Sequence, residues 1–226
     1  MPGTLDQHVD YTRKEWETKY YQDCIEYILA KSECYSFIDL GGCVGEVTNI
    51  LKERIKSLKY FYIIEPVREN FDFIVKRFGS NIGAEENKEF HKIETENGEF
   101  FNVYNKAIYY GSEEITLGQL SSDTNVGGWS YSDKHNLNLI GSVKTMSLEE
   151  IPVSEIIKID IEGLELNLLR NSQSLQECRF IFIELHGDLI GDFNFLGNYL
   201  PNHRVIYTES EQVFLELELI GDFNER

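Results

Sequence analysis

One stretch of the chain decides the fold: it reads SFIDLGGCVGEVTNIL and covers residues 36–51. A short, largely apolar run stops at the glycine pair Gly41 and Gly42, and apolar residues then return at helical spacing from Val47 onwards. The order is strand, glycine turn, helix. This order is typical of the first βα unit of an open α/β sheet, in which ligands bind at the carboxyl ends of the strands.

The same unit repeats along the chain. A near-continuous apolar run at 60–64 precedes a stretch with one apolar face at 71–78, and two successive βα units imply a parallel sheet. Two final runs, 204–207 and 213–217, flank polar residues and predict an antiparallel hairpin. The other predicted strands are 101–104, 156–159 and 180–183. We therefore expect a Rossmann-like α/β fold with a mostly parallel seven-stranded sheet, a C-terminal antiparallel hairpin and helices on both faces.

The N-terminal region is predicted to be helical. Apolar residues recur at every fourth position from Trp16 to Ile28, which indicates one amphipathic helix that ends shortly afterwards. No internal repeat and no proline-rich or serine-rich linker divides the chain. We therefore expect a single domain, with residues 1–33 as an N-terminal helical segment and residues 34–226 as the Rossmann-like core.

Two polar stretches are predicted as loops. Residues 79–98 are rich in glutamate and glycine, which favours a solvated surface excursion. Residues 118–141 are rich in serine, asparagine, aspartate and glycine, which favours a long binding loop. The second stretch also carries Trp129 and Tyr131, whose rings could stack on a substrate or belong to the core.

Composition and charge exclude several classes of partner. The formal net charge is −18, from 21 Lys and Arg against 39 Asp and Glu, which disfavours nucleic acid. No stretch approaches the ~20 apolar residues of a membrane span, so no membrane insertion is expected. The four cysteines lack CxxC spacing, which disfavours a zinc site and a disulfide framework and suits a reducing, cytoplasmic location. They are Cys24, Cys34, Cys43 and Cys178.

The glycine turn has the spacing of a specific cofactor loop. A dinucleotide fingerprint, GxGxxG, fails here, because counting from Gly41 places Cys43 and Glu46 where further glycines are needed. The pattern acid-x-Gly-x-x-x-Gly, formed by Asp39, Gly41 and Gly45, is typical of the loop that binds S-adenosylmethionine. A turn without any ligand would carry similar glycines, so the pattern does not decide alone.

Glu65 is the second candidate residue for cofactor binding. It ends the second predicted strand, 26 positions after Asp39 (65 − 39). A carboxylate at that strand tip can accept hydrogen bonds from both hydroxyls of a ribose. A glutamate at a strand end is ordinarily only a solvated terminus, and its place in a βαβ unit after the glycine turn favours the binding role.

Two further strand tips carry polar side chains. Asp160 and Glu162 follow the predicted strand 156–159, and Glu184 and His186 follow the next one. Because the carboxyl ends of parallel strands meet at one edge of a sheet, these four side chains should face the same crevice. An isolated histidine is more often structural, and the convergence with Asp160 favours catalysis.

The four residues allow two chemical roles. Asp160 or His186 would be the general base, and Glu162 and Glu184 would accept hydrogen bonds from neighbouring hydroxyls of an acceptor. Alternatively, a divalent ion could bind Asp160, Glu184 and His186, because hard oxygen ligands and one imidazole suit Mg²⁺ or Mn²⁺. A metal is possible and is not predicted.

Six segments together resemble the FkbM family of methyltransferases. They are DLGGCVG, IIEP, VRENF, YNKAI, KIDIEGLE and FIELH, and they span roughly residues 36–187. KIDIEG is the specific part, since the glycine loop is shared by most S-adenosylmethionine-dependent methyltransferases. The chain departs from the family where Gly42 and Cys43 replace a common alanine-asparagine pair.

The resemblance implies a class I methyltransferase fold and assigns the cofactor site. Asp39, Gly41, Gly42 and Gly45 would hold the amino-acid end of S-adenosylmethionine. Glu65 would hold the ribose, and the turn from Asn105 to Ala107 would hold the adenine.

The resemblance also implies O-methylation, because known members largely methylate hydroxyls of sugars or of polyketide-like natural products. We expect a sugar hydroxyl of a glycan or glycoconjugate as the acceptor, with a deoxyhexose such as rhamnose or fucose as the first to test. Trp129 and Tyr131 would then stack on the sugar. Two alternatives stay open: methylation of a small natural product or an amine, and a catalytically silent module that binds a glycan or a protein.

Overall fold

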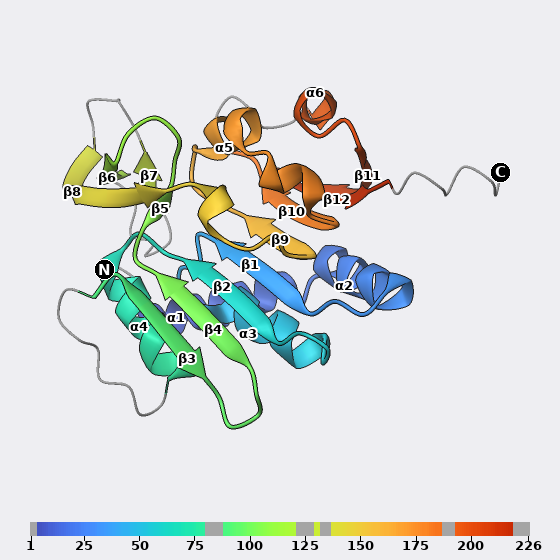
Figure 1. Cartoon of the computed structure of the whole chain (residues 1–226), viewed down its shortest axis with the longest axis horizontal. Helices are drawn as coiled ribbons and strands as arrows, with labels where there is room; N and C mark the ends of the chain where they lie inside the picture. Colours follow the sequence, from blue (N-terminus) through green and yellow to red (C-terminus); the bar gives the residue numbers. More distant parts are fainter. Residues whose placement is uncertain (1–3, 80–87, 121–128, 132–136, 187–192, 219–226) are drawn as a thin grey trace.

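A computed structural model of the chain describes residues 4–79, 88–120, 129–131, 137–186 and 193–218. Its main feature is an eight-stranded sheet with helices on both faces, as Figure 1 shows. The strands of this sheet are β1 (Ser36–Leu40), β2 (Tyr60–Ile64), β3 (Phe90–Glu94), β4 (Phe100–Tyr104), β9 (Ile156–Ile159), β10 (Phe180–Glu184), β11 (His203–Glu209) and β12 (Gln212–Leu217). Their order across the sheet is β11-β12-β10-β9-β1-β2-β4-β3.

The centre of the sheet is parallel. β1 pairs in parallel with β2 on one side and with β9 on the other, and β9 pairs in parallel with β10. The chain therefore leaves β1 in one direction and later returns to its other side. The carboxyl ends of β1, β2, β9 and β10 meet at one edge, which is where open α/β sheets bind their ligands.

Alternate residues of each central strand belong to two different cores. Phe37 packs in one core and Ile38 in the other, and both side chains are almost completely buried. Strands covered on both faces are expected to be apolar throughout, and this explains the apolar runs in the sequence. The predicted Rossmann-like α/β fold with a C-terminal hairpin, β11 and β12, is confirmed.

Helices cover both faces of the sheet, as the sequence predicted. One face carries α1 (Leu5–Trp16), α2 (Lys19–Lys31), α3 (Glu46–Arg54) and α4 (Arg68–Phe78). The other face carries α5 (Glu165–Asn171), α6 (Leu196–Tyr199) and the 3₁₀ turns η1 (Leu148–Glu150), η2 (Ser174–Glu177) and η4 (Phe193–Phe195). None of the described helices is both long and apolar enough to cross a membrane.

The N-terminal segment forms two helices: α2 confirms the predicted amphipathic helix, although it begins at Lys19 and not at Trp16, and α1 is an additional helix that precedes it. α1 ends at Trp16 and α2 begins at Lys19, with Thr18 in an extended conformation between them. The rings of Trp16 and Tyr21 stack with centroids 4.1 Å apart. The apolar pattern continues across the break because both helices bury their apolar residues against the same face of the sheet.

The sheet has eight strands and not the predicted seven. The additional strand is β3, which pairs antiparallel with β4 at the edge and lies inside the stretch predicted as a surface loop. His91 and Ile93 of β3 are buried, whereas Lys92 and Glu94 are exposed. An edge strand with one face in solvent alternates buried and polar residues. The composition of β3 is therefore as polar as that of a loop, which explains why the strand was not predicted.

The prediction of one long loop at 118–141 is also wrong, because much of this region belongs to a second sheet. Its strand order is β5-β8-β6-β7. The strands are β5 (Ala107–Ile108), β6 (Glu114–Leu120), β7 (Trp129–Tyr131) and β8 (Leu137–Met146). In β6 the buried residues Ile115 and Leu117 alternate with the exposed residues Glu114 and Thr116, and this alternation hid the strand. Trp129 and Tyr131 lie in β7, but their side chains are outside the described part of the chain.

Candidate active site

The glycine loop that follows β1 is shaped by its neighbours in the sheet. Gly41 has φ +76°, and a Cβ there would lie 1.8 Å from the carbonyl oxygen of Asp160. A Cβ at Gly42 would lie 2.3 Å from the side chain of Ile63. These two glycines are therefore required by close packing against β9 and β2, in addition to any approach of a ligand.

A pocket opens between this loop and the ends of the strands. Gly41, Gly42, Glu65 and Ala107, which the sequence assigned to the cofactor, all line the pocket. Asp160, Glu162 and Glu184 line it as well. Residues predicted to bind cofactor and residues predicted to be catalytic thus share one cavity.

Glu65 lies at the tip of β2 with its carboxylate held in place. The carboxylate accepts hydrogen bonds from the backbone N–H of Cys43 at 2.7 Å and from that of Val67 at 2.8 Å. Burial raises the pKa of Glu65 to about 7, although these hydrogen bonds oppose the shift. Its position at the pocket wall suits a carboxylate that accepts hydrogen bonds from a ribose.

Three residues predicted to touch the cofactor are not among the described lining residues of the pocket: Asp39, Gly45 and Asn105. Asp39 is completely buried and accepts a hydrogen bond from the Thr48 hydroxyl at 2.7 Å. Asn105 donates to the carbonyl oxygens of Glu65 and Pro66, at 3.0 Å and 2.8 Å. In this conformation these residues support the loop and the tip of β2.

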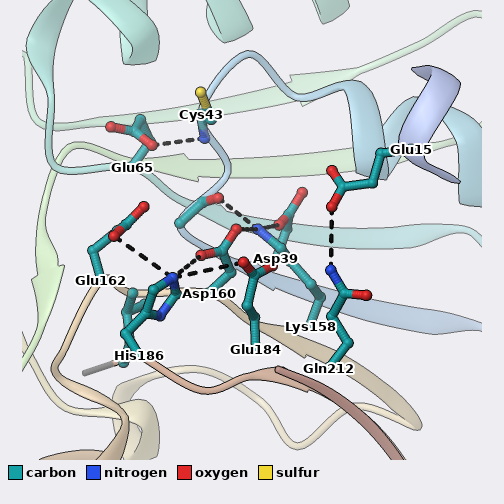
Figure 2. A network of polar contacts seen from close by, with 12 residues as sticks. Glu15, Asp39, Cys43, Glu65, Lys158, Asp160, Glu162, Glu184, His186 and Gln212 are labelled. Carbon is teal, nitrogen blue, oxygen red and sulfur yellow. Dashed lines mark hydrogen bonds and ion pairs between the residues drawn. The ribbon is translucent and has the colours of Figure 1, made fainter. Parts of the chain in front are cut away.

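The four candidate catalytic residues come together at the tips of β9 and β10, as Figure 2 shows. Nε2 of His186 lies 3.8 Å from Asp160, 3.6 Å from Glu162 and 3.7 Å from Glu184. Glu162 has φ +53°, which turns the chain back beside the strand tip. The side chains point toward one another, as expected for residues at the ends of adjacent parallel strands.

Glu165 is part of this cluster and was missed by the sequence reasoning. Its fully buried carboxylate lies 2.9 Å from Nδ1 of His186 and accepts hydrogen bonds from the N–H groups of Ile161 and Gly163. Burial disfavours a charged imidazole, but the contact with Glu165 and the other carboxylates raises the pKa of His186 to about 9. This shift favours the imidazolium form of His186 at neutral pH.

Lys158 was also missed, although one signal was present in the sequence. A lysine within the apolar strand IIKI must be buried in the centre of the sheet, and a buried lysine needs partners. Its ammonium lies 2.8 Å from the carbonyl oxygen of Gly41, 3.0 Å from Asp160 and 3.6 Å from Asp39. Burial opposes the charged form, yet the two carboxylates raise the pKa of Lys158 above its ordinary value.

A divalent ion would find ligands in the same cluster. One atom each of Asp160, Glu162 and His186 lies within 4.8 Å of the others. The metal ligands considered from the sequence were Asp160, Glu184 and His186, so the structure places Glu162 where Glu184 was expected. The hydrogen bond from Nδ1 of His186 to Glu165 is the kind of support that orients a metal-bound imidazole.

The fold and the pocket define a class of protein. A Rossmann-like sheet with a glycine loop after β1, a carboxylate at the tip of β2 and acids at the tip of β9 is the arrangement of a class I S-adenosylmethionine-dependent methyltransferase. The chain belongs to the FkbM methyltransferase family, because the methyltransferase FkbM domain matches residues 39–213. The resemblance drawn from the sequence is confirmed.

Solved structures of methyltransferases are similar to this chain at low sequence identity. A methyltransferase FkbM from Methylobacillus flagellatus is 15% identical with a TM-score of 0.51, over 81% of this chain and 44% of that chain. A putative caffeoyl-CoA O-methyltransferase from Staphylococcus aureus is 10% identical with a TM-score of 0.49, over 94% of this chain and 95% of that one. Trm1 from Pyrococcus horikoshii, solved with S-adenosyl-L-methionine, is 9% identical with a TM-score of 0.48, over 86% and 52%.

The similarity covers only part of the first of these proteins. The chain spans less than half the length of the Methylobacillus protein. No curated protein sequence matches the chain. At these identities the likeness shows the fold alone, and the acceptor has to be argued from the site itself.

Proposed function

We propose that the protein methylates a hydroxyl group of a sugar in a glycan or glycoconjugate, with S-adenosylmethionine as the methyl donor. One observation carries the proposal: Asp160, Glu162 and Glu184 line the same pocket as the glycine loop. A sugar presents several adjacent hydroxyls, and carboxylates are strong acceptors for them. A deoxyhexose such as rhamnose or fucose is the first acceptor to test.

S-adenosylmethionine supplies, when bound, a methyl group on a positively charged sulfur. The acceptor oxygen forms the new bond to the methyl carbon while the carbon–sulfur bond breaks, and the hydroxyl proton moves to a base of the protein. The protein must therefore align the acceptor oxygen with the methyl group and hold that base nearby. Gly41, Gly42, Glu65 and Ala107 would hold the cofactor, and the tips of β9 and β10 would hold the acceptor.

Asp160 is the residue that we assign as the base. It lines the pocket, and the ammonium of Lys158 fixes its carboxylate at 3.0 Å. His186, the other candidate, is already protonated at neutral pH and does not belong to the described lining of the pocket. Its role is to place positive charge among the carboxylates.

Glu162 and Glu184 suit contacts with neighbouring hydroxyls. Burial raises the pKa of Glu162 to about 7, and burial together with the charge of Asp160 raises the pKa of Glu184. Each side chain can then exist protonated or ionised near neutral pH, so each can donate or accept a hydrogen bond. Stacking of Trp129 and Tyr131 on the sugar and a cytoplasmic location remain predictions.

One observation favours a second acceptor class, an amine. The acidic residues of the pocket outnumber its cationic residues within the described chain, and an ammonium group would be attracted to them. An amine must lose its proton before it can accept a methyl group, so a base is needed here as well.

A silent binding module would bind cofactor or glycan without turnover.

Calorimetry and a transfer assay test the proposal. S-adenosylmethionine and its demethylated product are titrated into the protein, with NAD as a control. Labelled methyl donor is then supplied with glycosides of rhamnose and fucose, an amine and a phenol. Binding of the first two compounds with label on a sugar supports the proposal. Label only on the amine or phenol contradicts it, and binding without any transfer favours the silent module.

A further inference from the structure

The N-terminal helix α1 forms one side of the pocket. Tyr11, Thr12 and Glu15 of this helix line the cavity that Asp160 and Glu184 line from the sheet. Figure 2 shows Glu15 on its helix beside the strand tips that carry these acids. α1 precedes residues 39–213, the part that matches the FkbM family, so the family match assigns no role to it.

The helix is fixed in place over the pocket. Arg13 lies 2.7 Å from the carboxylate of Glu46 in α3, and this carboxylate is completely buried and also contacts Arg77. At the end of α1, the ring of Trp16 is buried and stacks on Tyr21 of α2. A helix held at two points presents its pocket-facing side chains in a defined geometry.

Tyr11 and Glu15 lie at the end of the pocket that holds the acids of the strand tips. Glu15 accepts a hydrogen bond from Gln212 of β12 at 3.2 Å, and burial followed by the charge of Asp160 raises its pKa. The charge of Glu15, then burial and the charge of Glu184, raise the pKa of Tyr11. The phenol of Tyr11 is therefore close enough to Glu15 of α1 and to Glu184 of β10 to feel the charges of both. The Tyr11 side chain is 60% exposed.

We propose that Tyr11 and Glu15 form an acceptor-binding subsite, with the Tyr11 ring against an apolar face of the sugar and the Glu15 carboxylate accepting a hydrogen bond from one of its hydroxyls. An aromatic ring that is exposed at a pocket mouth offers an apolar surface with a polar tip, which suits a sugar ring. The inference rests on the proposed function and identifies residues that select the acceptor.

The charge of this end of the pocket also restricts the acceptor. Lys158, which lines this end of the pocket, and His186, which lies next to it, already contact carboxylates. Lys106 lines the pocket next to Ala107, at the end predicted for the adenine. A phosphate or carboxylate on the acceptor would meet the carboxylates of Glu15 and Glu184, and the repulsion between like charges is unfavourable. The subsite therefore disfavours an anionic acceptor and suits a neutral, polyhydroxylated ring.

Kinetics of matched variants test the subsite. Tyr11→Ala and Glu15→Gln are compared with Asp10→Asn, which removes one carboxylate from an exposed position of the same helix. The acceptor is the methyl rhamnoside or methyl fucoside that the wild type methylates faster. We expect each of the first two variants to raise the acceptor KM about tenfold and to change the Kd of S-adenosylmethionine by less than about twofold. Asp10→Asn should match the wild type.

Two further measurements complete the test. Tyr11→Phe should keep the wild-type KM because it keeps the ring, and Glu15→Gln carries the test if Tyr11→Ala fails to fold. The 1-phosphate of the same sugar should show a kcat/KM at least about tenfold below that of the neutral glycoside. Preference for the phosphate would overturn the inference.

The remaining outcomes separate this inference from the proposed function. An active wild type whose two variants keep the acceptor KM would overturn the subsite and leave the proposed function standing. A weakened Kd for S-adenosylmethionine with an unchanged acceptor KM would assign α1 to the cofactor instead. A wild type that methylates no sugar would overturn the proposed function and the subsite together.

Discussion

The ammonium of Lys158 lies 3.0 Å from the carboxylate of Asp160. The same ammonium donates to the carbonyl oxygen of Gly41 at 2.8 Å and lies 3.6 Å from Asp39. One side chain therefore ties the residue assigned as the base to the cofactor loop. Because Lys158 is only 7% exposed and Asp39 is completely buried, these contacts replace water around both charges.

Replacing Lys158 should destabilise the protein strongly. Lys158→Met leaves the buried carboxylate of Asp39 without its counter-charge, and such a loss costs about 3 kcal/mol of unfolding free energy. Denaturant unfolding followed by circular dichroism measures the loss. Adding Asp39→Asn to the variant should restore part of the stability, because the unmatched charge is then gone.

A lysine of a more exposed ion pair provides the control for this variant. Lys52 lies 3.3 Å from Glu99 and is 27% exposed, so Lys52→Met should cost less than about 1 kcal/mol. Equal losses in the two variants would show that burial of the Lys158 contacts has no special weight.

The strand tips of the site could be predicted because their signal is local. Asp160 and Glu184 each follow or end an apolar run, and parallel strands bring their carboxyl ends to one edge. The contacts of Lys158 could not be predicted in the same way. The contacts of Lys158 with Gly41 and Asp39 join residues more than a hundred positions apart. These contacts form because β9 and β1 are neighbours in the sheet.

The elements that were predicted wrongly or not predicted lacked a clear local signal. β3 and β6 alternate buried and polar residues, so their composition resembles that of loops. The break between α1 and α2 is invisible in the apolar pattern, because burial on a common face continues through it. The position of α1 over the pocket depends on tertiary contacts such as that of Arg13 with Glu46.

Asp160→Asn should abolish most turnover and keep cofactor binding. The amide has the shape of the carboxylate but cannot take the proton, so kcat should fall by a factor of about 10² to 10⁴. Stopped-time assays with labelled methyl donor measure kcat, and calorimetry measures the Kd of S-adenosylmethionine. Glu184→Gln is the contrast: it should mainly raise the acceptor KM. A wild-type kcat in Asp160→Asn would remove this residue from the mechanism.

Cofactor affinity should depend on pH through Glu65. Burial raises its pKa to about 7, above the ordinary 4.5, so the free protein carries a protonated Glu65 below that pH. In the role proposed for Glu65, the ionised carboxylate would be the form that accepts hydrogen bonds from both ribose hydroxyls. Binding of S-adenosylmethionine should therefore weaken as pH falls below 7, by up to about tenfold per pH unit, and level off above about pH 8.

Two variants identify the group responsible for this pH dependence. Glu65→Gln should bind the cofactor more weakly and with a flatter pH profile. Glu162→Gln should keep the wild-type slope, although the pKa of Glu162 is also raised to about 7 and its side chain lines the same pocket. A Kd that stays constant from pH 6 to pH 8 in the wild type would contradict the role of Glu65.

The glycine loop allows a matched test of steric fit. Gly41 and Gly98 have nearly the same φ, +76° and +72°. A Cβ at Gly98 meets nothing within 4 Å, whereas a Cβ at Gly41 would lie 1.8 Å from the carbonyl oxygen of Asp160. Alanine at either position pays the conformational penalty of about 1 kcal/mol for positive φ. Gly41→Ala alone must also move the tip of β9.

Gly41→Ala should therefore lose more unfolding free energy than Gly98→Ala, by about 1 to 3 kcal/mol. It should also weaken S-adenosylmethionine at least about tenfold, because a shifted loop cannot keep its distance from Lys158 and Asp160. Denaturant unfolding and calorimetry on the two variants measure both effects. If the two alanine variants lose equal stability and bind the cofactor equally well, the contact between the loop and β9 can relax, and the close packing at Gly41 does not set the geometry of the site.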